Sequence, residues 1–341
     1  MAPSALELTR ARLLLRNVLS ARASVALAYH ADADGIASAA LGAAALERAG
    51  GTIAPLTPEK GHNIYDERFR RALDALGAGA ALMLDTGSRA NGAFGSTPTI
   101  VVDHHPTADR PRVHAFVHDD ESPATTLLTL ELVAPLAPLD DRHWLVALGI
   151  LGDSGGRAID HPILSAARSR FGAQPLREVV ALINASGRAA HPEPEVGLSA
   201  LRRADDPRSI VHGESSEARR LHALRREVTA ALAHARRVAP RVRGRFAIIE
   251  IASGCRIHGV LAAAWAKRLA PRIVLVSNRG YTPGRIHLSV RSHAPHDLRA
   301  ELRALLPHAG PDYAAGHARA SGAILDEGTY AELLHAIDQA A

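Results

Sequence analysis

The stretch Val101-Val102-Asp103-His104-His105 is an apolar run that ends abruptly in one carboxylate and two imidazoles. Its apolar part, from Ile100 onward, predicts a short core strand. In α/β sheets the binding crevice opens at the carboxyl ends of the strands, which is where this Asp and these His residues fall. Two other apolar runs end in the same way, Val25-Ala26-Leu27-Ala28-Tyr29 before His30-Ala31-Asp32-Ala33-Asp34-Gly35 and Ala81-Leu82-Met83-Leu84 before Asp85-Thr86-Gly87. Core packing alone does not explain three strand ends that each supply Asp, so the sequence predicts a polar site there.

Strand-like and helix-like segments alternate around these runs. Helical spacing of apolar residues follows or precedes the strands at 6–22, 36–49, 66–77, 125–133 and 143–150. This alternation predicts an α/β fold with a doubly wound, mostly parallel sheet. A second set of strands, at 246–251, 273–276 and 286–290, predicts a smaller α/β domain. We therefore expect a catalytic domain at 1–205, a connecting helix or linker at 206–240 and a second domain at 241–341.

The composition is that of an ordinary soluble globular protein. The chain has 341 residues, of which 47% are hydrophobic and 22% charged, enough to form two packed domains. No apolar run reaches the roughly 18 residues that a membrane-spanning helix needs, and the N-terminus is a poor secretory signal. The single cysteine, Cys255, excludes an internal disulfide. These features favour a cytoplasmic protein with no membrane partner.

The basic residues are almost all arginine. The net charge is +5, and only two of the 40 basic residues are lysine. Nine arginines fall between 219 and 245. Arginine suits bidentate contacts with phosphate, but codon bias and an ordinary solvated helix face explain the same pattern.

Eight Asp and His residues from four separate segments form the candidate metal site. Carboxylate and imidazole ligands without thiolate favour Mn²⁺, Mg²⁺ or Fe²⁺ over a structural Zn²⁺, and a carboxylate from a neighbouring strand can bridge two ions. Taken singly, an Asp after a strand is more often a helix N-cap, and a lone His is more often a structural residue. Four converging segments favour the metal site, whose members are His30, Asp32, Asp34, Asp85, Asp103, His104, His105 and Asp153.

These segments resemble, in order and spacing, the successive motifs of the DHH phosphoesterases. The motifs are Asp32-Ala33-Asp34-Gly35, Asp85, Asp103-His104-His105 and Gly152-Asp153. Farther on, Arg291-Ser292 and Gly316-His317 with Ala320-Ser321-Gly322 resemble the DHH-associated domain, whose glycine-rich loop binds substrate phosphates. The resemblance covers nearly the whole chain. The family includes RecJ-type single-strand exonucleases, NrnA-type nano-RNases and cyclic-dinucleotide phosphodiesterases.

The resemblance implies a role for each matching residue. Two divalent ions are expected, Mn²⁺ before Mg²⁺, with Asp85 as the bridging ligand. The implied metal ligands are His30, Asp32, Asp34, Asp85, His104 and Asp153. The implied catalytic residues are Asp85, Asp103 and His105, with His105 facing the scissile phosphate. The implied substrate-binding residues are Arg291, Ser292, Gly316 and His317.

The chain departs from the family pattern at two places. Ala28 stands where many bacterial members have a histidine, and His30 lies two residues before Asp32 instead, as in archaeal-type relatives. Ala315-Gly316 stands where members often have two glycines.

The expected function is hydrolysis of phosphodiester bonds in short oligonucleotides or small nucleotides, with single-stranded oligonucleotide or nucleotide as the substrate partner. Only 4% of the residues are aromatic, so a platform for stacking a long single strand is poorly supplied. The alternatives are a RecJ-like exonuclease on long single-stranded DNA, a polyphosphate or pyrophosphate hydrolase, and a nucleic-acid-binding scaffold without catalysis. The sequence leaves the oligomeric state open, with a homodimer among the expectations.

Overall fold

The computed structural model describes residues 3–87, 94–107, 110–154, 158–310, 313–317 and 319–340. The chain divides into two compact units, and each is described by itself. The first unit comprises residues 1–187 and 193–225, and the second comprises residues 188–192 and 226–341. The expected boundaries at 205 and 240 stay a prediction.

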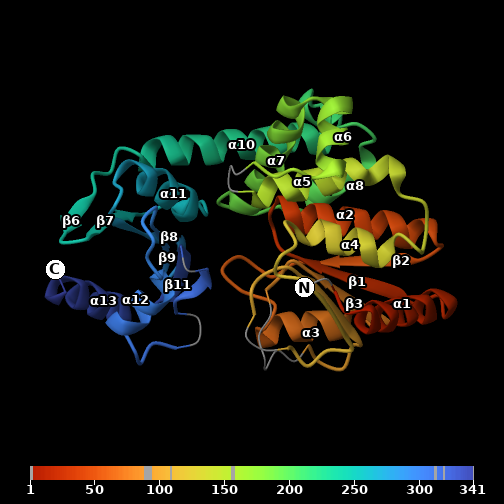
Figure 1. Cartoon of the computed structure of the whole chain (residues 1–341), viewed down its shortest axis with the longest axis horizontal. Coiled ribbons are helices and arrows are strands. Elements are labelled where there is room, and N and C mark those ends of the chain that lie inside the picture. Colours follow the sequence, from red (N-terminus) through yellow and green to blue (C-terminus); the bar gives the residue numbers. More distant parts are fainter. Residues whose placement is uncertain are drawn as a thin grey trace. The chain divides into compact units, whose positions relative to one another are not determined.

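The first unit is built on a five-stranded parallel sheet (Figure 1). Its strands are β1 (Ser24–Tyr29), β2 (Thr52–Leu56), β3 (Ala80–Leu84), β4 (Thr99–Asp103) and β5 (Ala115–His118). They lie in the order β2-β1-β3-β4-β5, and all neighbouring pairs are parallel. The expected α/β fold with a mostly parallel, doubly wound sheet is confirmed.

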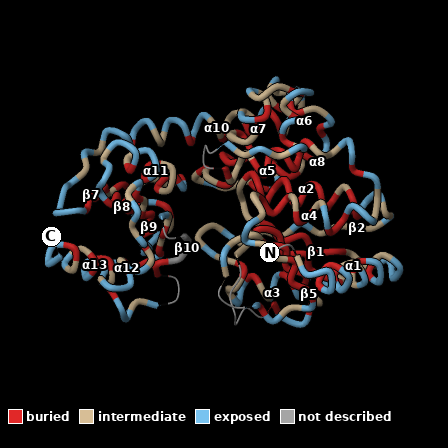
Figure 2. Tube along the Cα trace, in the orientation of Figure 1, coloured by how far each residue is buried: buried red, intermediate tan, exposed pale blue. Residues whose placement is uncertain are grey.

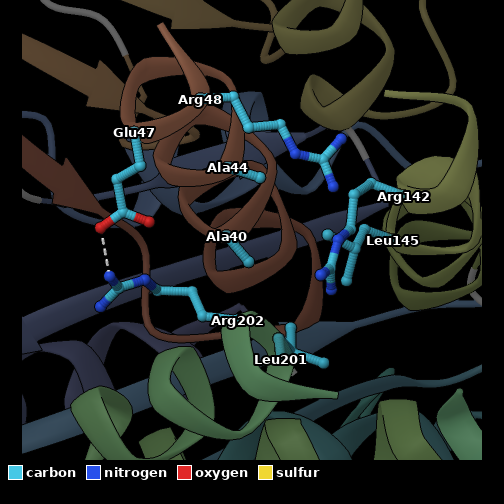
Figure 3. Close-up of a pocket in the computed structure, with 8 residues that line it drawn as sticks. All are labelled: Ala40, Ala44, Glu47, Arg48, Arg142, Leu145, Leu201 and Arg202. Carbon is cyan, nitrogen blue, oxygen red and sulfur yellow. Dashed lines mark hydrogen bonds and ion pairs between the residues drawn. The ribbon is translucent and has the colours of Figure 1, made fainter. Parts of the chain in front are cut away.

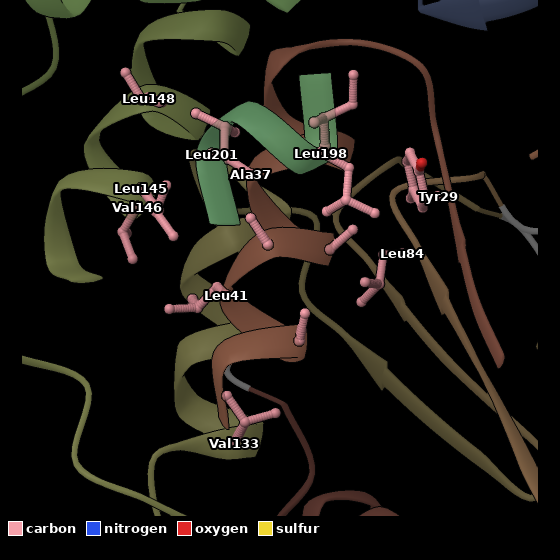
Figure 4. Packing of buried hydrophobic residues seen from close by; sticks show 14 of the residues in the cluster. Tyr29, Ala37, Leu41, Leu84, Val133, Leu145, Val146, Leu148, Leu198 and Leu201 are labelled. Atoms are coloured by element: carbon pink, nitrogen blue, oxygen red, sulfur yellow. The ribbon is translucent and has the colours of Figure 1, made fainter. Parts of the chain in front are cut away.

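Helices cover both faces of this sheet, because its side chains alternate between two apolar clusters. In β1, Val25, Leu27 and Tyr29 join the larger cluster together with α2, while Ala26 and Ala28 join a smaller one with α3. Figure 4 shows Leu41 of α2 packed among side chains of the surrounding helices. The helices of this unit are α1 (Ala5–Ser20), α2 (Ala33–Arg48), α3 (Glu67–Ala75), α4 (Thr125–Val133), η1 (Asp140–Arg142), α5 (His143–Asp153), α6 (Pro162–Phe171), α7 (Ala173–Arg188), α8 (Pro194–Arg203) and α9 (Pro207–Val211). Helix α10 (Ser216–Ala235) runs on into the second unit.

The second unit carries a six-stranded mixed sheet in the order β10-β11-β9-β8-β7-β6. Its strands are β6 (Arg241–Arg243), β7 (Phe246–Ile251), β8 (Ile273–Thr282), β9 (Arg285–Arg291), β10 (Ala315–His317) and β11 (Ala320–Leu325). Only β7 and β8 pair in parallel among these strands. The helices are α11 (His258–Arg268), α12 (Leu298–Leu305) and α13 (Glu327–Gln339). Leu298, Leu302 and Tyr330 pack with strand residues into its core.

In the first unit, burial is nearly complete along the central strands β1, β3 and β4 and along α2, and Figure 2 shows this for β1 and α2. Every residue of β3 and β4 is buried. The polar residues at the ends of these strands therefore adjoin an interior from which water is excluded. Within the described ranges, no helix is long and apolar enough to cross a membrane.

Candidate metal centre

The predicted site residues of the first unit lie at the carboxyl ends of β1, β3 and β4. The backbone pairing continues one residue past these strands, with His30 N donating to Leu84 O (3.1 Å) and Asp85 N donating to Val102 O (3.0 Å). From β1 the chain adds β2 on one side of the sheet and then β3, β4 and β5 on the other, so the topological switch point lies between β1 and β3. That point is where doubly wound sheets open a crevice for ligands, and the Asp residues after both strands enter it.

Asp32 and Asp34 occupy the start of α2. Asp32 is the N-cap of this helix, because its Oδ1 accepts a hydrogen bond from Gly35 N (3.1 Å). Its other carboxylate oxygen, Oδ2, faces His30 Nδ1 at 2.9 Å. Asp32 therefore caps the helix with one oxygen and takes part in the site with the other. Gly35 packs against the backbone of His30 so closely that a Cβ would overlap the His30 carbonyl. Asp34 lies inside the first turn and is fully buried.

Asp85 is the residue around which the others gather. Its φ of +61° lies in the left-handed region, which a non-glycine residue rarely adopts. Such strain is often found at functional sites. Three sets of side chains have donor atoms within 4.8 Å of one another, and Asp85 belongs to each. The sets are Asp85 with His104 and His105, Asp85 with Asp34, His104 and Asp153, and Asp85 with His30 and Asp32.

The two imidazoles after β4 are oriented by different partners. His104 Nδ1 lies 3.0 Å from the carbonyl of Ser122, and its Nε2 points to Asp153 Oδ2 at 2.8 Å. His105 Nδ1 pairs with Asp103 Oδ1 at 2.9 Å. Asp103 is fully buried behind His105 and belongs to none of the three sets. Asp153 is the last residue of α5, which extends three residues beyond the predicted helix at 143–150.

Burial and mutual repulsion set the protonation of these groups. Burial raises the pKa of Asp34, and the charges of Asp85 and Asp153 raise it further. Burial likewise raises the pKa of Asp85 to about 6. Burial lowers the pKa of His104, but its hydrogen bond to Asp153 and the charges of Asp34 and Asp85 outweigh this and raise the pKa to about 10. The same balance, with Asp103 as the partner, raises the pKa of His105 to about 9. In the absence of a cation, His104 and His105 are therefore protonated at neutral pH.

These residues fit divalent metal ions. The donors are carboxylate oxygens and imidazole nitrogens, which suit Mn²⁺ and Mg²⁺. The Oδ2 atom of Asp85 is buried and accepts no hydrogen bond from the described residues, an expensive arrangement unless a cation satisfies it. Several carboxylates buried together also repel one another unless positive charge separates them.

Sequence reasoning missed three residues that support the site. Thr125 donates its hydroxyl to Asp85 Oδ1 (2.9 Å). Asn184 of α7 accepts a hydrogen bond from Ala33 N (3.1 Å). Gly149 of α5 leaves room for Asp34, because a Cβ there would overlap Asp34 Oδ1. Of the three, only Thr125 could have been noticed in the sequence, because it is a polar residue immediately before an apolar helical run.

The four predicted substrate-binding residues lie in the second unit. Arg291 ends β9 and is half-buried, and its Nη1 donates to the carbonyls of Val290 (3.0 Å) and Ser321 (3.2 Å). Ser292 Oγ accepts a hydrogen bond from Ala294 N (3.1 Å). Gly316 and His317 belong to β10, where they pair with β11. Their side chains, His317 included, lie outside what the structure describes.

A separate small cavity of about 120 Å³ lies between α2, α5 and α8 (Figure 3). It contains none of the predicted site residues. Its three arginines are already paired, Arg202 with Glu47, Arg48 with Asp141 (2.8 Å) and Arg142 with Asp205 (2.9 Å). Each positive charge is balanced by a carboxylate, so the cavity is explained as an ion-paired seam between helices.

Comparisons with known proteins agree with the fold. No protein-family model matches the sequence, and no curated protein matches it. Among solved structures, an exonuclease RecJ bound to manganese matches with a TM-score of 0.71 and 20% identity, over 99% of this chain and 94% of that one. RecJ from Thermus thermophilus in complex with Mn²⁺ matches with a TM-score of 0.76 and 21% identity, over 99% of this chain, which spans 55% of the RecJ chain. The DHH domain of a member of a ribosomal protein family matches with a TM-score of 0.68 and 16% identity, over 98% and 90% of the two chains. The chain is thus similar in fold to RecJ and to a DHH-domain protein.

Proposed function

We propose that this chain is a metal-dependent phosphodiesterase of the DHH type, which hydrolyses phosphodiester bonds in short oligonucleotides or small nucleotides. The observation that supports this most is the position of Asp85 in all three sets of potential metal ligands. A single carboxylate shared between neighbouring sites is the arrangement by which two ions are held close together for phosphoryl chemistry.

The two oxygens of Asp85 face different partners. Oδ1 lies 3.7 Å from His104 Nε2 and 3.6 Å from His105 Nδ1. Oδ2 lies 3.7 Å from His30 Nδ1. In this proposal His30 and Asp32 would complete one site, Asp34, His104 and Asp153 would complete the other, and Asp85 would bridge them.

The chain's own residues would orient the substrate phosphate. When bound, two divalent ions polarise a phosphoryl oxygen and favour deprotonation of a water molecule. His105 keeps Nδ1 on Asp103, so its Nε2 is directed away from that carboxylate. In the metal-free protein, the hydrogen bond to Asp103 and the charges of Asp85 and Asp103 raise the pKa of His105 to about 9. The protonated ring is a hydrogen-bond donor that suits a phosphate oxygen.

Arg291, in the second unit, offers a positive charge that no carboxylate of the described residues neutralises. Arg291 makes no ion pair among the described residues, and its Nη2 lies 3.9 Å from the point where Gly259 would carry a Cβ, in the first turn of α11. His258 beside it is buried, and burial together with Arg256, His287 and Arg291 lowers its pKa to about 3. A half-buried guanidinium near a helix N-terminus suits a phosphate. This supports the role proposed for Arg291 in binding a substrate phosphate, and Ser292, Gly316 and His317 are proposed to act with it.

Preference for short substrates rests on the scarcity of stacking surfaces. Binding of long single strands uses aromatic side chains on which successive bases stack. The exposed large apolar side chains of the described residues are Leu6, Leu13, Leu76, Val242 and Ile324, none of them aromatic.

The test is a substrate panel with a matched pair of variants. Purified protein with Mn²⁺ is assayed on oligonucleotides of 2–5 residues, on single-stranded DNA of about 30 nucleotides, on cyclic dinucleotides and on pyrophosphate, and kcat/KM is compared. Asp85→Asn keeps the shape of the side chain but removes the shared charge, so Mn²⁺ affinity at both sites and activity should fall by at least about 100-fold. Asp160→Asn, at an exposed position outside the three sets, is the control.

Each part of the proposal has its own contrary result. Clear preference for the 30-nucleotide chain would replace it with a RecJ-like exonuclease. Cleavage of pyrophosphate without cleavage of diesters would indicate a phosphoanhydride hydrolase. Full activity and metal binding in Asp85→Asn would refute the metal centre itself.

A further inference from the structure

The first turn of α4 binds the carboxylate of Asp34. Thr125 N donates to Asp34 Oδ2 (2.6 Å) and Thr126 N donates to Asp34 Oδ1 (3.0 Å). Helix α4 receives no side-chain cap from its own N-cap residue, Ala124. Asp34, on α2, therefore supplies the cap, since a carboxylate satisfies the free N–H groups and complements the helix dipole.

Thr125 also binds a second carboxylate of the site. Its Oγ1 donates to Asp85 Oδ1 at 2.9 Å, and both residues are buried. An ionised carboxylate only accepts hydrogen bonds, so the threonine hydroxyl must be the donor. One residue therefore holds Asp34 through its backbone and Asp85 through its side chain.

This contact decides which oxygen of Asp85 faces which neighbours. Thr125 holds Oδ1, the atom on the side of His104 and His105. Oδ2 is left on the side of His30, and none of the residues that the structure describes donates a hydrogen bond to it. Rotation of the Asp85 carboxylate would break the Thr125 contact and move both oxygens away from their neighbours. A bridging carboxylate needs this fixed orientation, because each oxygen serves a different site.

We propose that Thr125 is a positioning residue, whose hydroxyl fixes the Asp85 carboxylate between the two metal sites while its backbone fixes Asp34. This inference rests on the metal-dependent function proposed above. Residues that orient metal ligands in this way commonly change metal affinity by 10–100-fold when they are replaced.

The experiment measures Mn²⁺ binding by calorimetry for a set of threonine variants. Thr125→Val removes the hydroxyl and keeps the shape, and should weaken Mn²⁺ binding about 10-fold. Thr125→Ser restores the donor and should stay within about 3-fold of the wild type. Thr129→Val is the control, because the Thr129 hydroxyl is equally buried but donates to the Thr125 carbonyl of the same helix (3.0 Å). Its Mn²⁺ affinity should not change.

The outcomes separate this inference from the function on which it rests. Circular dichroism of the metal-free variants first shows that they are folded, and Thr125→Ala takes the place of Thr125→Val if the latter is not. Wild-type Mn²⁺ affinity in a folded variant without the hydroxyl would overturn the positioning role while leaving the metal centre intact. Equal weakening in the Thr125→Ser and Thr129→Val variants would also overturn it, since the effect would not follow the hydroxyl. Absence of Mn²⁺ binding in the wild type would overturn the proposed function as well.

Discussion

Asp85 combines an unfavourable backbone conformation with an unfavourable environment. Its φ of +61° is uncommon for a non-glycine residue, and its carboxylate is almost fully buried beside other acids. Strain of this kind costs on the order of 1–3 kcal/mol, and it persists only where the surroundings fix it. Here the backbone is held by pairing to Val102, and Oδ1 is held by Thr125. The residue is thus fixed before any ion arrives.

The histidines after β4 make metal binding dependent on pH. In the metal-free protein the pKa of His104 is about 10 and that of His105 about 9, so both rings carry a proton at pH 7. Of the two, His104 is the proposed ligand and can bind a metal only after losing that proton, and the raised pKa of Asp34 adds a similar competition. We expect Mn²⁺ affinity to rise steadily from pH 6 to pH 9, with about one or more protons released per protein at pH 7.

Calorimetry in buffers of different ionisation enthalpy measures this release directly. The observed binding enthalpy should change with the ionisation enthalpy of the buffer at pH 7. The metal-free protein should show the opposite trend in stability. A histidine with a raised pKa stabilises the fold fully below its unfolded pKa of about 6.5, and this contribution is lost as the pH rises through 9–10. A binding enthalpy at pH 7 that is independent of the buffer would contradict the protonated state of His104.

At the scale of elements, α2, α4 and α5 meet around the Asp34 carboxylate. Asp34 stands in the first turn of α2 and accepts hydrogen bonds from the first turn of α4. Helix α5 approaches through Gly149, where a Cβ would overlap both Asp34 Oδ1 and Thr126 Oγ1. A glycine inside a helix costs about 1 kcal/mol relative to alanine, and here that cost is offset by the close approach of the acid.

Gly149→Ala should therefore damage the site despite its better helix propensity. We expect the variant to lose about 1–3 kcal/mol of unfolding free energy from overpacking and to bind Mn²⁺ more weakly, because Asp34 must shift. Gly42→Ala is the matched control on α2, since its Cβ would meet only Leu82 Cδ2, at an ordinary 3.7 Å. That variant should be neutral or up to about 1 kcal/mol more stable. Urea unfolding and Mn²⁺ titration measure both effects, and equal behaviour of the two variants would refute the role of Gly149.

The sequence predicted the strands that carry the site better than the elements that support it. Strands β1, β3 and β4 are continuous apolar runs, because both of their faces are covered by helices, and such runs are visible in a single sequence. Strand β2 was missed, because it is only partly buried and contains Pro55. The strand at the opposite edge of the sheet, β5, has only four residues and was missed as well. Short or half-exposed edge strands carry little periodic signal.

The supporting contacts could not be predicted, for a different reason. Thr125, Gly149 and Asn184 act through hydrogen bonds and close approaches across 40 to 151 residues of sequence. No local sequence pattern specifies such distant partners. The acids and histidines of the site, in contrast, can be recognised in the sequence because they directly follow apolar strands. In the second unit, β10 was missed, because a three-residue strand has no periodicity to detect.

On the scale of the whole molecule, the two units contain different chemistry. The first unit holds the clustered carboxylates and histidines that suit cations. In the second, the described residues around Arg291 and His258 are basic or neutral, a setting that suits an anion. The net charge of +5 is small for 341 residues, so attraction of a polyanionic substrate depends on where charges gather more than on their sum.

Arg291 tests this division between the units. If Arg291 binds a substrate phosphate, Arg291→Ala should raise KM about 10–100-fold, because a hydrogen bond to a charged group contributes about 1.5–3 kcal/mol. Mn²⁺ affinity should stay within about 2-fold of the wild type, since no metal-site residue belongs to the second unit. Arg285→Ala is the control, because Arg285 is an exposed arginine at the start of the same strand. Arg291→Lys keeps the charge but not the bidentate fork, and we expect an intermediate KM from it. If Arg291→Ala is folded and yet loses Mn²⁺, then Arg291 serves the metal centre, and separate binding of cation and substrate by the two units is wrong.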